Sequence, residues 1–196
     1  FLDKNYNSIF RNGQFLNNSL SISGGDSKSN YFMSIGDMNQ QGVIRNNSNY
    51  RRTTFRVNVS RQMNNWLKIS NKASYVLTNS DRVRRGASSG GAMLGLLRTP
   101  TDFDNTDYIG SYFDNNGVEF RNRHRSYRRY KGDNVQPTFN NPLWTIYNQT
   151  ANSNVNRFLL SSEVTSNPLP WLDLILRSGI DANNDDRVYF FPVGSA

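Results

Sequence analysis

Few residues of this sequence could carry out catalysis, and they are scattered. The chain has one histidine, His124, and no cysteine, so it offers no thiolate nucleophile and no disulfide framework. The sequence around His124 has no motif typical of a Ser-His-Asp catalytic triad. We expect His124 to be a loop residue. Zinc needs three or four clustered ligands. The sequence therefore predicts no catalytic residue, no metal site, no cofactor and no enzyme activity.

Carboxylates gather at two places. The spacing that begins a calcium-binding loop occurs at Asp181, Asn183 and Asp185. The glycine that this motif needs at its sixth position is replaced by Asp186, so we interpret the segment as a loop at a strand end. A second oxygen-rich loop group consists of Asp102, Asp104 and Asp107, and calcium binding stays an open alternative to plain loop positions at both places. Paired carboxylates can hydrolyse glycosides, so a polysaccharide-acting enzyme stays an alternative without a defined site.

The strongest charge feature is a basic run at 121–131. The net charge is +8, and much of it comes from Arg121, Arg123, Arg125, Arg128, Arg129 and Lys131. No nucleic-acid recognition module frames the run, so we expect no nucleic-acid partner. A solvated loop and a surface for anionic sugar, lipid or substrate both remain open.

Tyrosines interleave with asparagine and arginine in the same region, as in surfaces that bind sugars. The candidates for contact with a substrate or partner are Tyr108, Tyr112, Phe113, Arg123, Arg125, Tyr127, Arg128 and Tyr130. For each of them, a hydrated loop position is the alternative.

The elements that must position these residues are β-strands. Hydrophobic residues make up only 36% of the chain, aromatics 13%, and the mean hydropathy is −0.71, which suits strands that are apolar on one side. Period-two alternation predicts strands at about 15–24, 30–39, 50–60, 66–78, 155–165 and 171–181. In 30–39 both sides carry apolar residues, so its faces cannot be assigned. A short helix is expected at 91–97, before Pro100.

The connections between these strands alternate between short and long. Short turns fall near 25–29, 61–65 and 166–170, whereas 40–49 and 79–152 are long. Outer-membrane barrels have short periplasmic turns and longer extracellular loops, and lipid cannot satisfy open strand edges. The predicted fold class is all-β: an antiparallel transmembrane β-barrel segment of about six strands from a larger barrel, with a long extracellular loop at 79–152. A soluble carbohydrate-binding β module is the alternative.

Individual side chains can be assigned to a membrane environment on this reading. Trp66 and Trp171 directly follow short turns and are expected in an interfacial girdle. The residues predicted to face lipid are Phe55, Val57, Val59, Leu67, Ile69, Leu172, Leu174 and Leu176. Their neighbours Arg56, Lys72 and Arg177 are expected to line an aqueous interior.

Several motifs resemble the SusC/RagA-type TonB-dependent transporters. They are Ser23-Gly24-Gly25-Asp26, the stretch from Tyr31 to Ile44, the stretch from Tyr50 to Val59, Trp66-Leu67-Lys68-Ile69, Leu97-Arg98-Thr99-Pro100 and Asn141-Pro142-Leu143. The resemblance covers about 15–190 and is most specific over 23–77. The chain starts at Phe1 without a signal-peptide pattern, so we expect a mature product or a segment of a longer protein.

The resemblance implies an importer of glycans, peptides or other large nutrients in the outer membrane of Bacteroidetes-type bacteria. Such proteins form a barrel of about 22 strands closed by an N-terminal plug. A SusD-like surface lipoprotein caps the barrel and TonB acts on the plug. No plug is recognisable in 1–196, so we expect a partial barrel that contributes to nutrient uptake only within a whole transporter.

Overall fold

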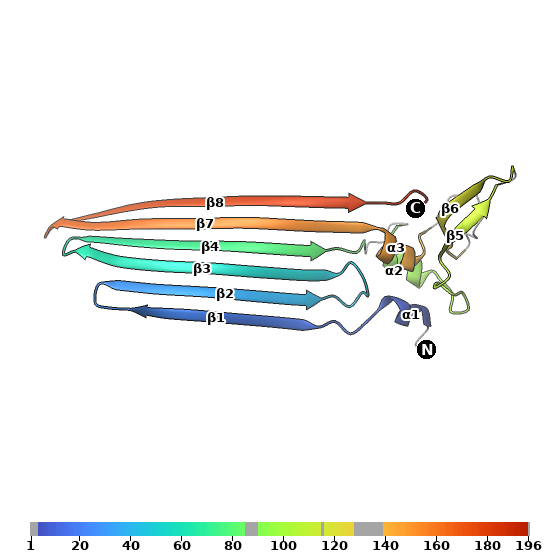
Figure 1. The fold of residues 1–196 in the computed structure, drawn as a ribbon, viewed down its shortest axis with the longest axis horizontal. Coiled ribbons are helices and arrows are strands. Elements are labelled where there is room, and N and C mark those ends of the chain that lie inside the picture. The colour runs from blue at the N-terminus through green and yellow to red at the C-terminus, as the bar shows by residue number, and fades with distance from the viewer. Residues whose placement is uncertain (1–3, 85–89, 115, 128–138, 196) are drawn as a thin grey trace.

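The protein is described by a computed structural model that covers residues 4–84, 90–114, 116–127 and 139–195. A six-stranded antiparallel sheet extends away from a small group of helices and a two-stranded hairpin (Figure 1). The helices are α1 (Lys4–Ile9), α2 (Ala92–Leu97) and α3 (Pro142–Asn148). The sheet strands are β1 (Phe15–Gly25), β2 (Ser29–Gln41), β3 (Asn49–Asn64), β4 (Leu67–Asp81), β7 (Thr150–Leu169) and β8 (Leu172–Phe190). The hairpin strands are β5 (Ile109–Phe113) and β6 (Glu119–His124).

The predicted all-β antiparallel fold is confirmed. The sheet order β1-β2-β3-β4-β7-β8 follows the chain, so each strand lies beside the one that precedes it. The tight turns β1–β2, β3–β4 and β7–β8 lie at one end, and the long connections at the other (Figure 1). Among the described helices, none is both long and apolar enough to cross a membrane.

The strand register places most apolar side chains on one face of the sheet, called here the apolar face. One row across all six strands consists of Leu20, Ile35, Phe55, Tyr75, Phe158 and Ala182. The next row consists of Ile22, Met33, Val57, Ala73, Leu160 and Ile180. The pairing with β3 also assigns the faces of 30–39, because Ile35 and Met33 lie opposite Phe55 and Val57.

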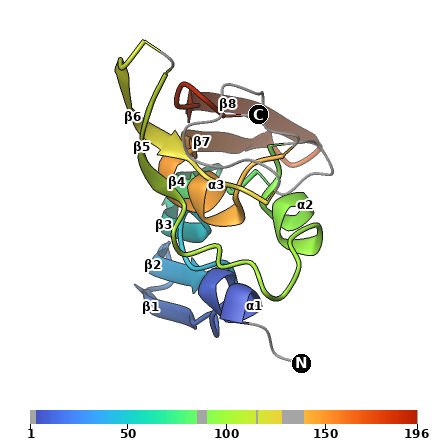
Figure 2. The same ribbon diagram turned by 90° about the vertical axis from the view of Figure 1, so that its right-hand side faces the viewer.

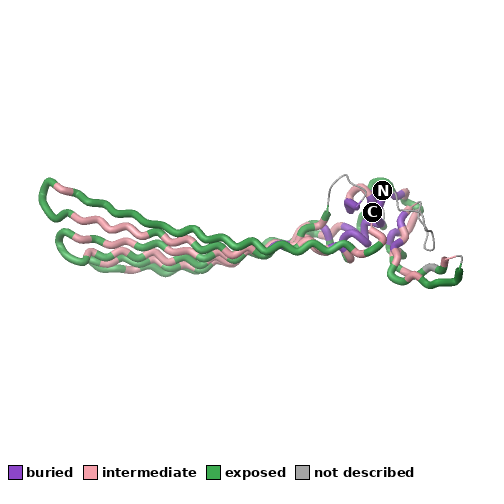
Figure 3. Tube along the Cα trace, turned by 90° about the horizontal axis from the view of Figure 1, so that it is seen from above, coloured by how far each residue is buried: buried purple, intermediate pink, exposed green. Residues whose placement is uncertain are grey.

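No second layer of the described structure covers the apolar face. Figure 3 shows the buried residues concentrated at one end of the molecule, and a single layer of intermediate and exposed residues elsewhere. On the apolar face Leu20 is 72% exposed, Phe55 47% and Leu176 69%. The buried apolar cluster lies instead in the end group: Ile9, Ile44, Ala92, Leu96, Leu143 and Ile146. The sheet therefore has no hydrophobic core of its own.

The end group, called here the end cap, consists of α1, the β2–β3 connection, α2, α3 and the β5–β6 hairpin (Figure 2). The cap covers the polar face of the sheet at the long-connection end. Ser80 of β4 and Ser153 of β7 are paired there and are only 9% and 3% exposed. The next residues on the apolar face, Asn79 and Asn154, stay exposed.

Two parts of the chain differ from the sequence-based expectations. The strands are longer than predicted, and β8 continues to Phe190, so the interpretation of Asp181–Asp186 as a loop is wrong. Polar residues continue this strand because β7 pairs with it up to Thr150 opposite Phe190. Within the expected loop 79–152, the helix predicted at 91–97 is present as α2, but α3, β5 and β6 were not expected.

Candidate functional site

An asparagine network holds the end cap together. Asn141 caps α3, because its Oδ1 accepts a hydrogen bond from the Leu143 backbone N–H at 2.8 Å. Its Nδ2 donates to the carbonyl oxygens of Asn105 at 3.2 Å and Arg125 at 2.8 Å. The Asn105 backbone N–H donates in turn to Asn5 Oδ1 at 3.0 Å. These amides satisfy backbone groups that burial would otherwise leave unpaired.

The β2–β3 connection is docked onto the C-terminal end of α3. The side-chain amides of Asn46 and Asn47 each donate to the Ile146 carbonyl oxygen at 2.9 Å. Asn47 has a φ of 49°, a conformation that asparagine tolerates better than most residues. On its other side, Ile44 forms a bridge with Phe10 after α1. Segments far apart in the sequence are thus fixed in one cap.

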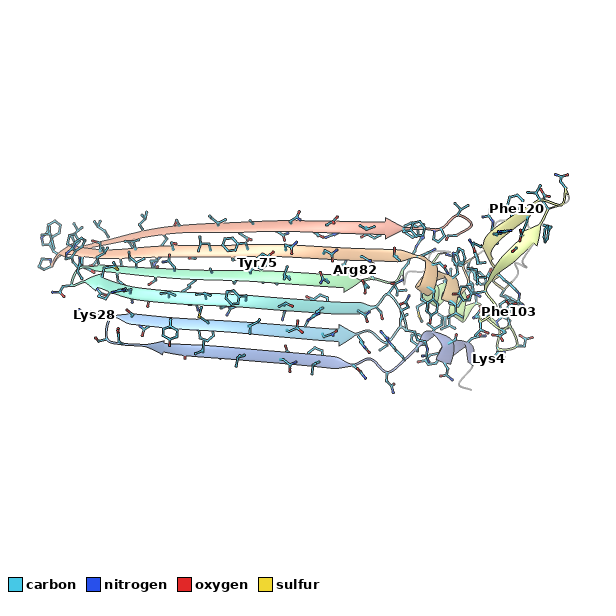
Figure 4. All side chains as sticks on the ribbon, viewed as in Figure 1. Lys4, Lys28, Tyr75, Arg82, Phe103 and Phe120 are labelled. Carbon is cyan, nitrogen blue, oxygen red and sulfur yellow. The ribbon has the colours of Figure 1, made fainter. Side chains whose placement is uncertain are left out.

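The basic run divides into two groups. The guanidinium of Arg125 lies 4.1 Å from the centre of the Phe103 ring, and its Nη1 donates to the Asp104 carbonyl oxygen at 3.2 Å. Tyr127 packs edge-on against the same ring, with centroids 5.9 Å apart. Figure 4 labels Phe103 beside the cap helices and Phe120 on the hairpin that projects from them. Arg125 and Tyr127 therefore belong to the packing around Phe103.

Arg121 and Arg123 belong to the hairpin. The Nε of Arg121 pairs with Glu119 Oε2 at 2.8 Å, whereas the Arg123 guanidinium lies 5.5 Å from the Phe120 ring centre. Phe113 is 65% exposed on β5. Among the other predicted contact residues, Arg128 and Tyr130 lie outside the described residues, as does the side chain of Tyr112.

Tyr108 and His124 pack inward. Tyr108 stacks on Tyr147 at a centroid distance of 6.4 Å, and burial raises the pKa of its hydroxyl, opposed by a side-chain hydrogen bond with Asn148. His124 is 1% exposed, lies at the end of β6 and packs against Trp144 at 5.1 Å. The expectation of a loop position for His124 is wrong, because the hairpin carries it into the cap.

A hollow of about 480 Å³ lies between the hairpin, α3 and the segment after β8. Its lining consists of Ile109, Arg121, Asn122, Arg123, Trp144, Asn148, Phe190, Pro192 and Val193. Of these residues, sequence reasoning singled out only Arg121 and Arg123. Asn141-Pro142 is a helix start signal that could have revealed α3, and with it Trp144. Residues 190–193 reach the hollow only because β8 continues to Phe190. The apolar–polar alternation of the sequence did not indicate that length.

Charged residues line the polar face of the sheet. Arg177 Nε pairs with Glu163 Oε2 at 2.7 Å, and Arg157 Nη2 with Asp181 Oδ2 at 2.6 Å. On the same face, neither Arg56 nor Lys72 has an ion-pair partner within 4.0 Å in the described part of the chain. The polar face thus combines neutralised pairs on β7–β8 with free positive charge on β3–β4.

The calcium-like spacing is spread along β8 instead of forming a loop. Asp181 pairs with Arg157, and Asp185 accepts from Ser153 Oγ at 3.0 Å and pairs with Arg187. Over the ranges that the structure describes, no group of three histidine, cysteine, aspartate or glutamate side chains could hold a metal ion.

The two predicted girdle tryptophans lie at the tight-turn end of the sheet. Trp66 is 47% exposed and Trp171 is 77% exposed. Their turns are neighbours, because the Asn167 backbone N–H donates to the Trp66 carbonyl oxygen at 2.7 Å. Lys28 marks this end in Figure 4, and Arg82 marks the opposite end. None of the eight residues predicted to face lipid is buried: Phe55, Val57, Val59, Leu67, Ile69, Leu172, Leu174 and Leu176.

Comparisons with known proteins give matches among solved structures only. No protein-family model matches the sequence, and no curated protein matches it. The structure of the RagAB peptide importer in the "closed-closed" state superposes with a TM-score of 0.68 at 22% identity, over 93% of this chain. The "open-open" state of the same importer gives a TM-score of 0.67 at 22% identity over 92%. A further RagAB peptide transporter structure gives 0.67 at 21% over 93%.

This similarity concerns the fold. The chain spans 19% of the length of each matched chain, so what is matched is one part of a much longer protein. Nearly the whole of the described chain, sheet and cap together, takes part in the superposition. The chain therefore has the fold of a segment of the RagAB peptide importer structures.

Proposed function

We propose that this chain is part of the barrel wall of an outer-membrane, TonB-dependent importer of the SusC/RagA type. In this role it contributes six neighbouring strands and the folded extracellular cap above them. The uncovered apolar face of the sheet carries the proposal. The similarity to the RagAB peptide importer structures supports it.

An apolar face of this extent needs a partner that covers it. Soluble monomers rarely expose contiguous apolar patches larger than a few hundred Å², yet two apolar rows cross all six strands here. Acyl chains would cover the face without a second protein layer. The free edges of β1 and β8 would then pair with further strands of a closed barrel, since lipid offers no hydrogen bonds to an open edge.

The height of the apolar surface supports this environment. On β4 the series runs from Leu67 to Leu77, with Asn71 as its polar exception. Ten residue steps span about 34 Å along a strand. A strand tilt of about 40° reduces this to roughly 26 Å, close to the apolar band of about 25 Å in outer-membrane barrels. Trp66 and Trp171 would occupy the periplasmic interface.

The polar face would line the aqueous interior of the barrel. Its ion pairs and the free charges of Arg56 and Lys72 suit a hydrated lumen, and the cap folds over this face at the extracellular end. Substrate would be a peptide or a glycan captured at that end. A SusD-like lipoprotein would close the barrel from outside, in contact with exposed residues such as Phe113. TonB would act through a plug that belongs to another part of the transporter.

Localisation and uptake test this proposal in cells. The full-length protein is expected in the outer-membrane fraction, and a strain without it is expected to lose growth on peptides or glycans supplied as the sole nutrient. Recovery of the full-length protein in the soluble fraction contradicts the proposal. So does unchanged growth of the deletion strain on every peptide and glycan tested.

The two rival functions predict different behaviour. If residues 1–196 fold cooperatively as a monomer without detergent, the soluble carbohydrate-binding module is favoured. The exposure of the apolar face counts against that outcome. Turnover of a polysaccharide by the purified full-length protein, lost on changing one carboxylate, would instead establish an enzyme.

A further inference from the structure

The hollow beside the β5–β6 hairpin combines positive charge with an apolar surface. It is lined by strand, helix and the segment after β8, so its walls come from three parts of the chain. Its volume of about 480 Å³ lies within the range of small-ligand sites. The floor is Trp144, which is 2% exposed and fixed by a hydrogen bond from its Nε1 to Ser195 Oγ at 2.9 Å.

Of the two arginines that line this hollow, Arg123 has no carboxylate partner within 4.0 Å among the described residues. Arg121 is already paired with Glu119, whereas the buried Nε of Arg123 has no hydrogen-bond acceptor among the described residues. Burying such a donor without an acceptor is costly. A small shift of the side chain into the hollow would allow Nε and a terminal nitrogen to bind both oxygens of a carboxylate, the geometry that guanidinium groups favour.

Neighbouring groups hold Arg123 close to this geometry. Its guanidinium lies over the Phe120 ring at 5.5 Å. It also lies against Gly194, where an added Cβ would meet Arg123 Nη1 at 3.0 Å. Gly194 also has a φ of 93°, which disfavours any side chain there. Preorganisation of this kind lowers the entropy cost of binding.

The rest of the lining is apolar and accessible. Ile109 is 42% exposed, Phe190 57% and Val193 80%. These exposed apolar side chains lie around the guanidinium of Arg123. Such a surface favours a ligand that has a carboxylate next to an apolar group. The C-terminal residue of a peptide, with an apolar side chain, has this chemistry.

We infer that the hollow binds the C-terminal carboxylate of a peptide, with Arg123 as the anion-binding residue and the apolar walls receiving the terminal side chain. This inference rests on the proposed import of peptides and specifies which end of the peptide the extracellular cap recognises. Glutamate and aspartate side chains offer the same carboxylate chemistry, so the test must separate them from the chain terminus.

The test uses the purified full-length transporter in detergent and three N-acetylated probes. These are Ala-Ala-Leu with a free C-terminus, the same peptide as its C-terminal amide, and amidated Ala-Glu-Leu. Calorimetry is expected to show the free acid binding about 10- to 100-fold more tightly than either amide, as the loss of a charge-assisted hydrogen bond predicts. Arg123→Gln should abolish that preference, Arg123→Lys should restore part of it, and Arg98→Gln in the cap should leave it intact.

Several results overturn the inference. They are equal binding of acid and amide, tighter binding of the glutamate probe, no binding of any probe, and an acid preference that survives Arg123→Gln. Circular dichroism checks that each variant stays folded. Peptide uptake by cells is measured in parallel: uptake without an acid preference contradicts only the role of the hollow, whereas a lack of any peptide or glycan uptake contradicts the proposed function.

Discussion

The Nε of Arg51 lies 3.0 Å from Asp37 Oδ1 on the apolar face of the sheet. Thr53 Oγ1 donates to the same carboxylate oxygen at 2.8 Å. This group begins in the row that follows Ile35 and Phe55 toward the cap, and the same row contains Asn18, Asn156 and Asn184. On β2, β3 and β7 the apolar series therefore ends at this row, whose member on β4 is Leu77. Under the proposed function, this row marks the extracellular membrane boundary.

Neighbouring positions on β3 should report opposite environments. Spin labels are attached to the full-length transporter in liposomes, one at a time, through Val57→Cys, Asn58→Cys and Asn156→Cys. The sequence 1–196 has no cysteine. Once any cysteines elsewhere in the full-length transporter are replaced, each introduced cysteine is the single labelling site. Oxygen, which concentrates in the bilayer, should broaden the spin-label signal at position 57. A water-soluble nickel complex should instead broaden the signals at positions 58 and 156. Equal nickel access at 57 and 58 contradicts a lipid-facing apolar face.

A charge on the apolar face should weaken folding into a bilayer. Val57→Lys places a cation in a central apolar row, where the cost is about 2–4 kcal/mol. Asn58→Lys is the matched control on the polar face, and we expect it to be nearly neutral. Denaturant-dependent folding of the full-length protein into vesicles measures the difference in free energy of unfolding. Similar losses for both variants would argue that lipid does not contact position 57.

Close packing of α2 against the segment before α3 should make Gly95 intolerant of a side chain. A Cβ there would lie 2.3 Å from the Asn140 carbonyl oxygen, so we expect Gly95→Ala to destabilise the cap by about 1–3 kcal/mol. Gly36→Ala is the control, since the nearest atom to its added Cβ is 3.8 Å away. Hydrogen exchange of α2 and α3 measures the effect, and unchanged exchange in Gly95→Ala contradicts this packing.

Acid should loosen the contact within the end cap between α1 and the segment around Asp104. Hydrogen bonds from the Thr106 hydroxyl and backbone N–H, with the contact to Lys4, lower the pKa of Asp104 to about 2 from its ordinary value of 3.8. Because the pKa of Asp104 is lower in the folded state than in the unfolded state, the ionised carboxylate stabilises the folded cap. This stabilisation is complete above about pH 4 and is lost as the pH falls toward 2.

Hydrogen exchange of residues 4–10 and 104–107, corrected for its intrinsic pH dependence, follows this loss. Asp104→Asn should show faster exchange at pH 5 and little further change on acidification. Asp102→Asn, two residues away, should behave like the unaltered protein. If Asp104→Asn keeps the full acid response, another group is responsible for it.

Period-two patterning was sufficient to predict the sheet. In strands such as 50–60, alternate side chains lie on the same face and share one environment. The alternation of apolar and polar residues therefore indicates which residues share a face. The alternation of short and long connections likewise indicated which strand ends lie together. These features are local, and they can be read without knowing what the strands pack against.

The site required information that no single segment contains. Asn141, Asn105 and Asn5 are linked by hydrogen bonds although Asn5 and Asn141 lie 136 positions apart in the chain. The local sequence at Asn141-Pro142 signals a helix start, but nothing in the local sequences of Asn5 and Asn105 distinguishes them from surface asparagines. The same holds for Asp181 on β8, which is read as a loop residue until Arg157 on β7 is seen to pair with it.

The sequence by itself determined the strand character of the chain, the two faces of most strands but not of 30–39, and the ends at which the turns lie, because side-chain alternation is a short-range property. Only the tertiary structure decided which asparagines are buried, which arginines pack inward and which two, Arg121 and Arg123, line a hollow built from three separate segments. Those outcomes depend on register and on contacts between residues far apart in the chain, where the free energy of burial is set jointly by all the partners.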